Sequence, residues 1–134
     1  MPCQTTIRTR SIIKPLFSDI SNVRVFVADL TVAVEFYRDV LGLPLRLHTP
    51  EFALFDTGSA TLMIEPGGND PTDGALVGRF TGISLTTADL AAAYAALRDQ
   101  GVDFLHPPER QPWGTLTHFR DPSGNVLSAV EYVR

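Results

Sequence analysis

The 134-residue sequence has only one cysteine, Cys3, so no disulfide bond can form within the chain. A chain without disulfides is typical of a reducing compartment, and we therefore expect a cytoplasmic protein. Cys3 lies in the N-terminal tail, apart from every motif described below, which argues against a catalytic thiol.

Long apolar runs and an excess of positive charge are also missing. No stretch of about 18 apolar residues is present, so the sequence predicts no membrane-spanning helix. Lys and Arg total 11 against 15 Asp and Glu, a formal net charge of -4. A nucleic-acid interface needs clustered Lys and Arg, so DNA and RNA are not expected partners. Residues 1–19 lack the apolar core of a secretory signal, and we interpret them as an N-terminal extension that frays or contacts a partner.

What the sequence does contain is an internal repeat. The stretches 23–43 and 84–102 follow one plan at an offset of 60 residues, with Asp29 matched by Asp89. In each, an alternating strand leads into an amphipathic helix that an aspartate caps and a glycine ends. Two copies of about 60 residues would each be marginal alone, so the repeat predicts one domain of two packed halves.

The hydrophobic periodicity predicts an α+β fold of two tandem βαβββ modules. Modules 20–66 and 79–133 form one domain, 20–133, and are joined by an aperiodic linker at 67–78 that is rich in Gly, Asn, Asp and Pro. Segment 106–114 contains three prolines, which lack N–H donors, so we expect it to be a loop over the sheet edge. The predicted helices run from Asp29 to Leu41 and from Asp89 to Gln100; the predicted strands are 21–28, 44–48, 52–56, 60–65, 80–87, 102–105, 115–120 and 126–132.

Five short motifs, together with the duplication, resemble one known family. They are Val27-Ala28-Asp29-Leu30, Phe36-Tyr37, Leu41-Gly42-Leu43, Pro112-Trp113-Gly114 and the turn motif at 119–125. Over about residues 20–132 the chain is similar to the vicinal oxygen chelate superfamily of glyoxalase I, extradiol dioxygenases and bleomycin-resistance proteins. The resemblance implies paired modules whose curved mixed sheets enclose a ligand cavity, commonly completed across a dimer. We therefore expect a homodimer, in which the second copy covers the open sheet edges.

Enzymes of that family hold a divalent metal through His, Gln or Glu side chains on the first and last strands of the modules. The matching positions here are Asn22, Gly82 and Ser128, with Met63 or Glu65 at the fourth. A catalytic metal needs about three converging protein ligands, and only Glu65 is a usual one. We therefore expect no metal and no other cofactor, and the resemblance is closer to the drug-binding branch of the family.

Strand alternation predicts which side chains face the ligand cavity, opposite the helices. Arg24 either pairs with Glu65 or anchors an anionic or carbonyl group of a ligand. His118 is either a hydrogen-bonded core residue or a general base, whereas His48 and His106 are expected at the surface. Trp113 either packs at the sheet edge or stacks on a planar ligand. The predicted ligand-binding set is Arg24, Phe26, Phe52, Met63, Glu65, Trp113, His118 and Ser128.

Three functions remain open from the sequence. The first is metal-independent binding of a small planar or aromatic molecule by a protein of the glyoxalase and bleomycin-resistance type. The second is an enzyme, namely a lactoylglutathione lyase-like lyase, an isomerase or a dioxygenase, which uses a divalent metal or a metal-free acid–base pair of Glu65 and His118. The third is a subunit whose cavity has lost its function.

Overall fold

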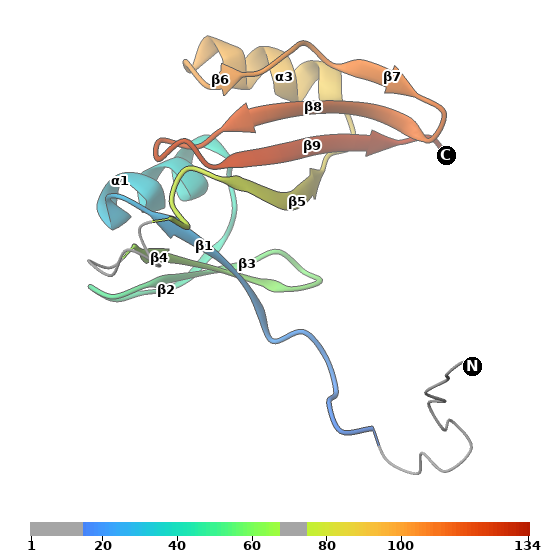
Figure 1. The fold of residues 1–134 in the computed structure, drawn as a ribbon. Coiled ribbons are helices and arrows are strands. Elements are labelled where there is room, and N and C mark those ends of the chain that lie inside the picture. Colours follow the sequence, from blue (N-terminus) through green and yellow to red (C-terminus); the bar gives the residue numbers. More distant parts are fainter. Residues whose placement is uncertain (1–14, 68–74) are drawn as a thin grey trace, which may run out of the picture.

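The computed structural model of the chain describes residues 15–67 and 75–134 (Figure 1). Cys3, most of the predicted N-terminal extension and most of the predicted linker lie outside these residues. In the described part of the chain, no helix combines the length and the apolar character needed to cross a bilayer.

The first module is a four-stranded sheet with one helical segment. Strand β1 (Asn22–Val27) is parallel to β4 (Thr61–Pro66), and the sheet order is β1-β4-β3-β2 with antiparallel pairs elsewhere. The remaining elements are α1 (Leu30–Glu35), the π-helical turn η1 (Phe36–Val40), β2 (Leu45–His48) and β3 (Ala53–Asp56).

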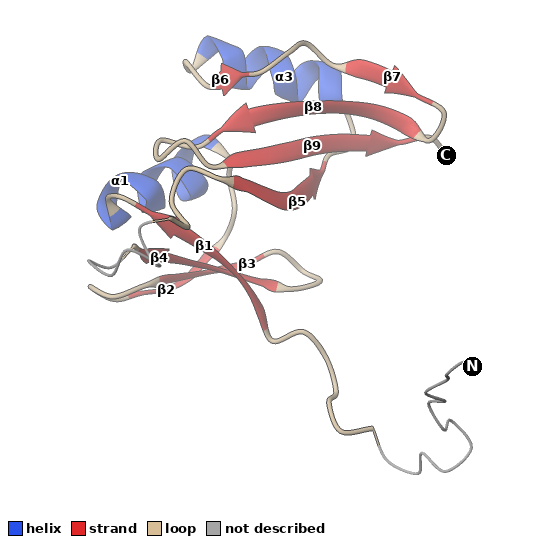
Figure 2. Ribbon diagram, in the orientation of Figure 1, coloured by secondary structure: helices blue, strands red, loops and turns tan. Residues whose placement is uncertain are grey.

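The second module repeats this strand order, β5-β9-β8-β6, again with its first and last strands parallel (Figure 2). The same order in both sheets confirms the predicted α+β fold of two βαβββ modules. Its elements are β5 (Phe80–Thr86), α3 (Leu90–Asp99), β6 (Asp103–Phe104), β7 (Glu109–Gln111), β8 (Gly114–Arg120) and β9 (Val126–Tyr132).

Two local predictions are wrong. The segment expected as a loop contains β7, which pairs antiparallel with β8, because its prolines flank those three residues rather than interrupt them. Gly114 makes the return into β8 possible, since a Cβ there would collide with the carbonyl oxygen of Glu131. The second error concerns the first helix, which was expected to be a single α-helix but becomes π-helical from Phe36. There the amide of Leu41 donates to the carbonyl of Phe36, five residues earlier.

The core lies between the sheets and α1, as the alternation predicts. Val25 and Val27 of β1 are almost fully buried, and Asp29 caps α1 by accepting a hydrogen bond from the amide of Val32. Residues of the second module, including Phe119 and Leu127, belong to the same apolar cluster. One core therefore serves both modules, and strand residues of opposite parity point away from it.

A buried polar network joins the modules at the turn between β8 and β9. The Asn125 side chain donates to the carbonyl of Phe26 (2.8 Å) and accepts from the amides of Gly78 (2.8 Å) and Arg79 (3.2 Å). It also donates to Asp121, whose other carboxylate oxygen accepts from the amides of residues 123 and 125. Asn125 is fully buried and Asp121 nearly so, and such groups are stable in a core only when their hydrogen bonds are made.

Tyr37 completes this network from the π-helical turn. Its hydroxyl donates to Asp121 at 2.8 Å. Burial, and then the charge and hydrogen bond of Asp121, raise the pKa of Tyr37 well above its usual value, so the hydroxyl remains a donor. The turn therefore bonds one module to the other through a charged acceptor.

We predict that Tyr37→Phe lowers the free energy of unfolding by about 2 kcal/mol, because Asp121 loses a buried charge-assisted hydrogen bond. Tyr94→Phe is the matched control, since the Tyr94 ring packs on Phe104 and no hydrogen bond of its hydroxyl is found among the described residues. Urea denaturation of the three proteins makes the comparison. Equal stability of Tyr37→Phe and Tyr94→Phe would contradict the role of the network.

Candidate functional site

The strand side chains that point away from the helices form what we call the open face. In the first sheet, Arg24 lies opposite Met63 and Phe26 lies opposite Glu65 across the β1–β4 pair, while the alternate residues are buried. In the second sheet, His118 lies opposite Ser128 across the β8–β9 pair. Six of the eight predicted ligand-binding residues therefore occupy open-face positions.

Arg24 and Glu65 form an ion pair on this face. Nε and a terminal nitrogen of Arg24 donate to the two carboxylate oxygens of Glu65, at 2.7 and 3.1 Å. The guanidinium also lies over the Phe26 ring, 5.1 Å from its centre. The two-point contact fixes the orientation of both groups and keeps both Glu65 oxygens occupied.

The remaining two predicted residues lie elsewhere. Phe52 precedes β3 and closes the turn after β2, where its amide donates to the Thr49 hydroxyl and its carbonyl accepts from the Thr49 amide. Trp113 stands at the turn between β7 and β8, with its ring 5.5 Å from that of Tyr132 and 40% of its surface exposed. Trp113 therefore packs at the edge of the second sheet and keeps part of its indole accessible.

His118 contacts His106, which we expected at the surface. Nε2 of His106 lies 2.8 Å from Nδ1 of His118, and Nδ1 of His106 lies 2.8 Å from the carbonyl oxygen of Pro107. A carbonyl oxygen can only accept, so Nδ1 of His106 carries a proton and, in the neutral pair, His118 donates to His106. Nε2 of His118 is then left with a lone pair.

The protonation of His118 follows from its surroundings. Burial and, to a smaller extent, His106 lower the pKa of His118 from its usual value, while Glu109 acts in the opposite direction. The lowered pKa favours the neutral ring, in which Nε2 is a hydrogen-bond acceptor and a base.

His106 reaches His118 because segment 105–107 lies against β8, where the Leu105 amide donates a hydrogen bond to the His118 carbonyl.

The positions that correspond to the family's metal ligands do not fit a metal ion. Gly82 offers no side chain and has φ 75° at an irregularity in the β5–β9 pairing. Ser128 is buried between His118 and Ser84, and Glu65 is held by Arg24. Across residues 15–67 and 75–134, no three His, Cys, Asp or Glu side chains are grouped to hold a metal.

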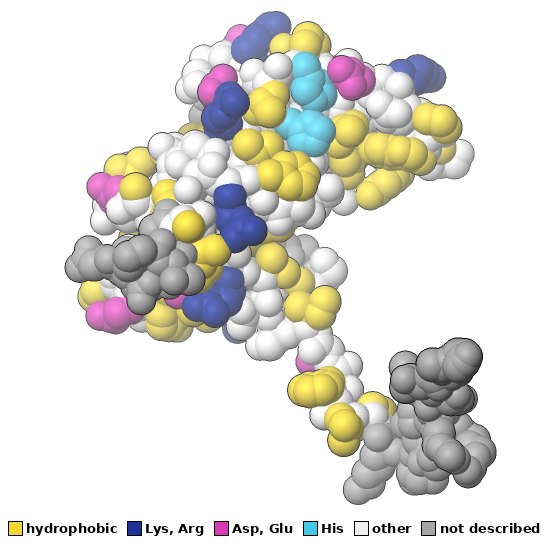
Figure 3. Space-filling model, viewed as in Figure 1, with side chains coloured by type: hydrophobic (Ala, Val, Ile, Leu, Met, Phe, Trp, Pro, Cys, Tyr) yellow, Lys and Arg dark blue, Asp and Glu magenta, His cyan; other side chains and the backbone are white. Residues whose placement is uncertain are grey.

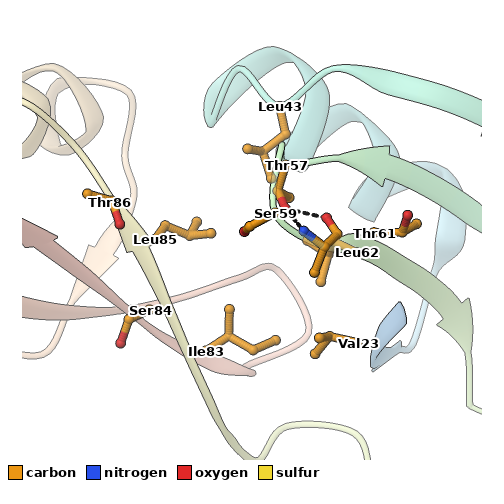
Figure 4. A pocket seen from close by; sticks show the side chains of 11 residues that line it. Val23, Leu43, Thr57, Ser59, Thr61, Leu62, Ile83, Ser84, Leu85 and Thr86 are labelled. Carbon is orange, nitrogen blue, oxygen red and sulfur yellow. Dashed lines mark hydrogen bonds between the residues drawn. The ribbon is translucent and has the colours of Figure 1, made fainter. Parts of the chain in front are cut away.

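A cavity of about 310 Å³ lies between the modules, on the helix side of the sheets (Figure 4). Ile83 and Leu85 of β5 point across it toward Leu43, Leu62 and Val23, whereas Ser84 and Thr86 point away. No ionisable residue is among its lining, which is completed by Thr57, Ser59, Ala60 and Thr61. This cavity was not predicted from the sequence and contains none of the predicted ligand-binding residues.

A smaller pocket of about 130 Å³ lies where the open faces of the two modules meet; we call it the junction pocket. Arg24 and Phe26 line it from the first module, Arg79 and Phe80 from the second. Phe80 is 61% exposed, and its ring lies 6.2 Å from that of His118. Figure 3 shows two adjacent histidine side chains, in cyan, on the same face as apolar side chains and Lys or Arg side chains. The remaining lining residues are Val25, Leu76, Thr81 and Asn125.

Two βαβββ modules that share one core, with a pocket where they meet, define the class of this α+β fold. The chain belongs to the Glyoxalase/Bleomycin resistance protein/Dioxygenase superfamily, whose model matches residues 19–128.

Three similar proteins illustrate the range of this family. The chain is 31% identical to protein YraH of Bacillus subtilis (strain 168), over 78% of this chain and 91% of that one. It is 27% identical to TnmS3, an antibiotic binding protein from Streptomyces sp. CB03234, with a TM-score of 0.75 and coverage of 90% and 100%. It is 26% identical to a lactoylglutathione lyase from Agrobacterium tumefaciens, with a TM-score of 0.68 and coverage of 87% and 96%. The family therefore includes both binding proteins and enzymes.

We predict that His118 lowers the stability of the fold as the pH falls. Its folded-state pKa is lowered, so as pH falls below about 6.5 the unfolded chain takes up a proton that the native state resists. The free energy of unfolding should therefore decrease as the pH is lowered from 7.5 to 5.5. The decrease should be smaller in His118→Asn. Exposed His48→Asn is the control, and urea denaturation across pH is the measurement. Identical pH dependence in His118→Asn and the parent would contradict this account.

Proposed function

We propose that this protein binds a small planar or aromatic organic molecule on its open face, without a bound metal ion. The observation that carries the proposal is the junction pocket, where Phe26 and Phe80 present rings beside Arg24 and Arg79. Aromatic rings and a few placed polar groups are typical of ligand pockets. The family's metal positions here, Asn22, Gly82 and Ser128, support binding over Lewis-acid catalysis.

The relatives support either function, since one is an antibiotic binding protein and another a lyase. Fold alone does not decide between them, so the site residues must. The observation that favours an enzyme is the His118 base, whose Nε2 lone pair faces away from His106. Glu65 is a poor partner for it, because Arg24 holds both carboxylate oxygens. Acid–base chemistry without metal is therefore the second candidate, and it would rest on His118 alone.

We also propose that the chain acts as a cytoplasmic homodimer. Two exposed apolar side chains, Tyr132 and Val133, each keep more than half of their surface open. A second copy that covers them would bury apolar area and complete the site. Sedimentation at micromolar concentration should give twice the chain mass of 14.6 kDa. A sedimentation mass equal to that of one chain would contradict the proposal that two chains complete the site.

The binding proposal predicts that chelator-treated protein still binds planar aromatic molecules. A panel of neutral, acidic and basic single-ring and fused-ring compounds is tested by thermal shift and by the fluorescence of Trp113, the only tryptophan. At least one compound class should raise the melting temperature, and Phe80→Ala should weaken that effect. Phe17→Ala, which removes an exposed ring that does not line the pocket, is the control.

Metal analysis separates this proposal from the metal-dependent enzyme. After chelation and refilling with zinc, nickel and iron, we expect no stoichiometric ion to survive dialysis. The proposal is wrong if about one ion per chain is retained and ligand binding requires it.

A further inference from the structure

Within the described part of the chain, the junction pocket contains one arginine whose charge no acidic side chain offsets. The charge of Arg24 is offset by its two-point contact with Glu65. Arg79 also lines the pocket, and within residues 15–67 and 75–134 no ion pair of its side chain is found. Its backbone amide is fixed by Asn125. Arg79 therefore presents a guanidinium, the side chain best suited to a planar carboxylate, from an anchored point of the chain.

The same pocket presents an aromatic surface sized for one ring. Phe80 follows Arg79 in sequence and is 61% exposed. The pocket volume of about 130 Å³ is below the range of about 300–1,000 Å³ filled by drug-sized ligands. A single substituted ring that packs on Phe80 would fill it.

A hydrogen-bond acceptor, His118, lies next to Phe80 and outside the residues that line the pocket. The His118 ring lies 6.2 Å from the Phe80 ring. The Nδ1–H of His118 donates a hydrogen bond to Nε2 of His106, and the Nδ1–H of His106 donates to the Pro107 carbonyl. This chain fixes the tautomer of the neutral His118 and leaves Nε2 as an acceptor. A hydroxyl on a ring packed against Phe80 is the group that such an acceptor recognises.

We propose that the junction pocket binds a hydroxylated aromatic carboxylate: Arg79 pairs with the carboxylate, Phe80 packs on the ring, and Nε2 of His118 accepts a hydrogen bond from the ring hydroxyl. This inference rests on the proposed function, which requires only that an aromatic molecule bind. It adds the charge of the ligand and the residue that selects its hydroxyl.

The test is isothermal titration of metal-free protein with benzoate, its neutral isostere benzamide, phenol, and 3- and 4-hydroxybenzoate. Benzoate should bind more tightly than benzamide, and Arg79→Gln should weaken benzoate binding about tenfold while leaving benzamide unchanged. At least one hydroxybenzoate should bind more tightly than benzoate. His118→Asn should remove that gain and leave benzoate affinity as it was.

Arg110→Gln on β7 is the matched control, because Arg110 is exposed and does not line the pocket. Equal affinity for benzoate and benzamide, or an unchanged benzoate affinity in Arg79→Gln, would overturn the anionic class while leaving aromatic binding intact. Failure of every aromatic compound to bind would overturn the proposed function as well. A hydroxyl gain that survives His118→Asn would overturn the role of His118. Loss of the dimer in Phe80→Ala with benzoate affinity unchanged would assign Phe80 to the subunit interface instead.

Discussion

The hydrogen bonds of Asn125 hold this structure together at the point where its two modules meet. One side-chain amide bonds the end of β1 through Phe26 and the approach to β5 through Gly78 and Arg79. Asp121 orients that amide and is itself held by Tyr37 of the first module. Because these groups are buried, none can be left unpaired without a cost of about 1–3 kcal/mol. The same bonds set Arg79 and Phe80 beside Arg24 and Phe26, so the junction pocket depends on them.

The family fold is kept here with a different set of site residues. Gly82 sits at an irregular strand position and Ser128 is buried beside His118 in the β8–β9 pair, while Glu65 is paired with Arg24. Three of the four residues at metal-ligand positions are thus explained by local packing or pairing. What remains on the open face is a guanidinium, aromatic rings and an oriented imidazole, a set that recognises a ligand by charge, shape and hydrogen bonding.

The sequence predicted the features that depend on local periodicity. Alternation along β1 and β4 placed Arg24, Phe26, Met63 and Glu65 on one face, and the aspartate at each helix start was recognised as a cap. The features it missed depend on contacts between distant segments. The partnership of His106 with His118 follows from how segment 105–107 lies on β8, and β7 forms because β8 offers it a free edge. Arg79 and Phe80 enter the site through the docking of two modules, which no pattern within one module reveals.

The most direct test of this account is a crystal structure of the metal-free protein soaked with whichever of 3- and 4-hydroxybenzoate binds more tightly. The account predicts ligand density in the junction pocket, against the Phe80 ring, with the carboxylate at Arg79 and the hydroxyl at Nε2 of His118. Density in the apolar cavity between Leu62 and Ile83, or a ligand held through a metal ion, would contradict it.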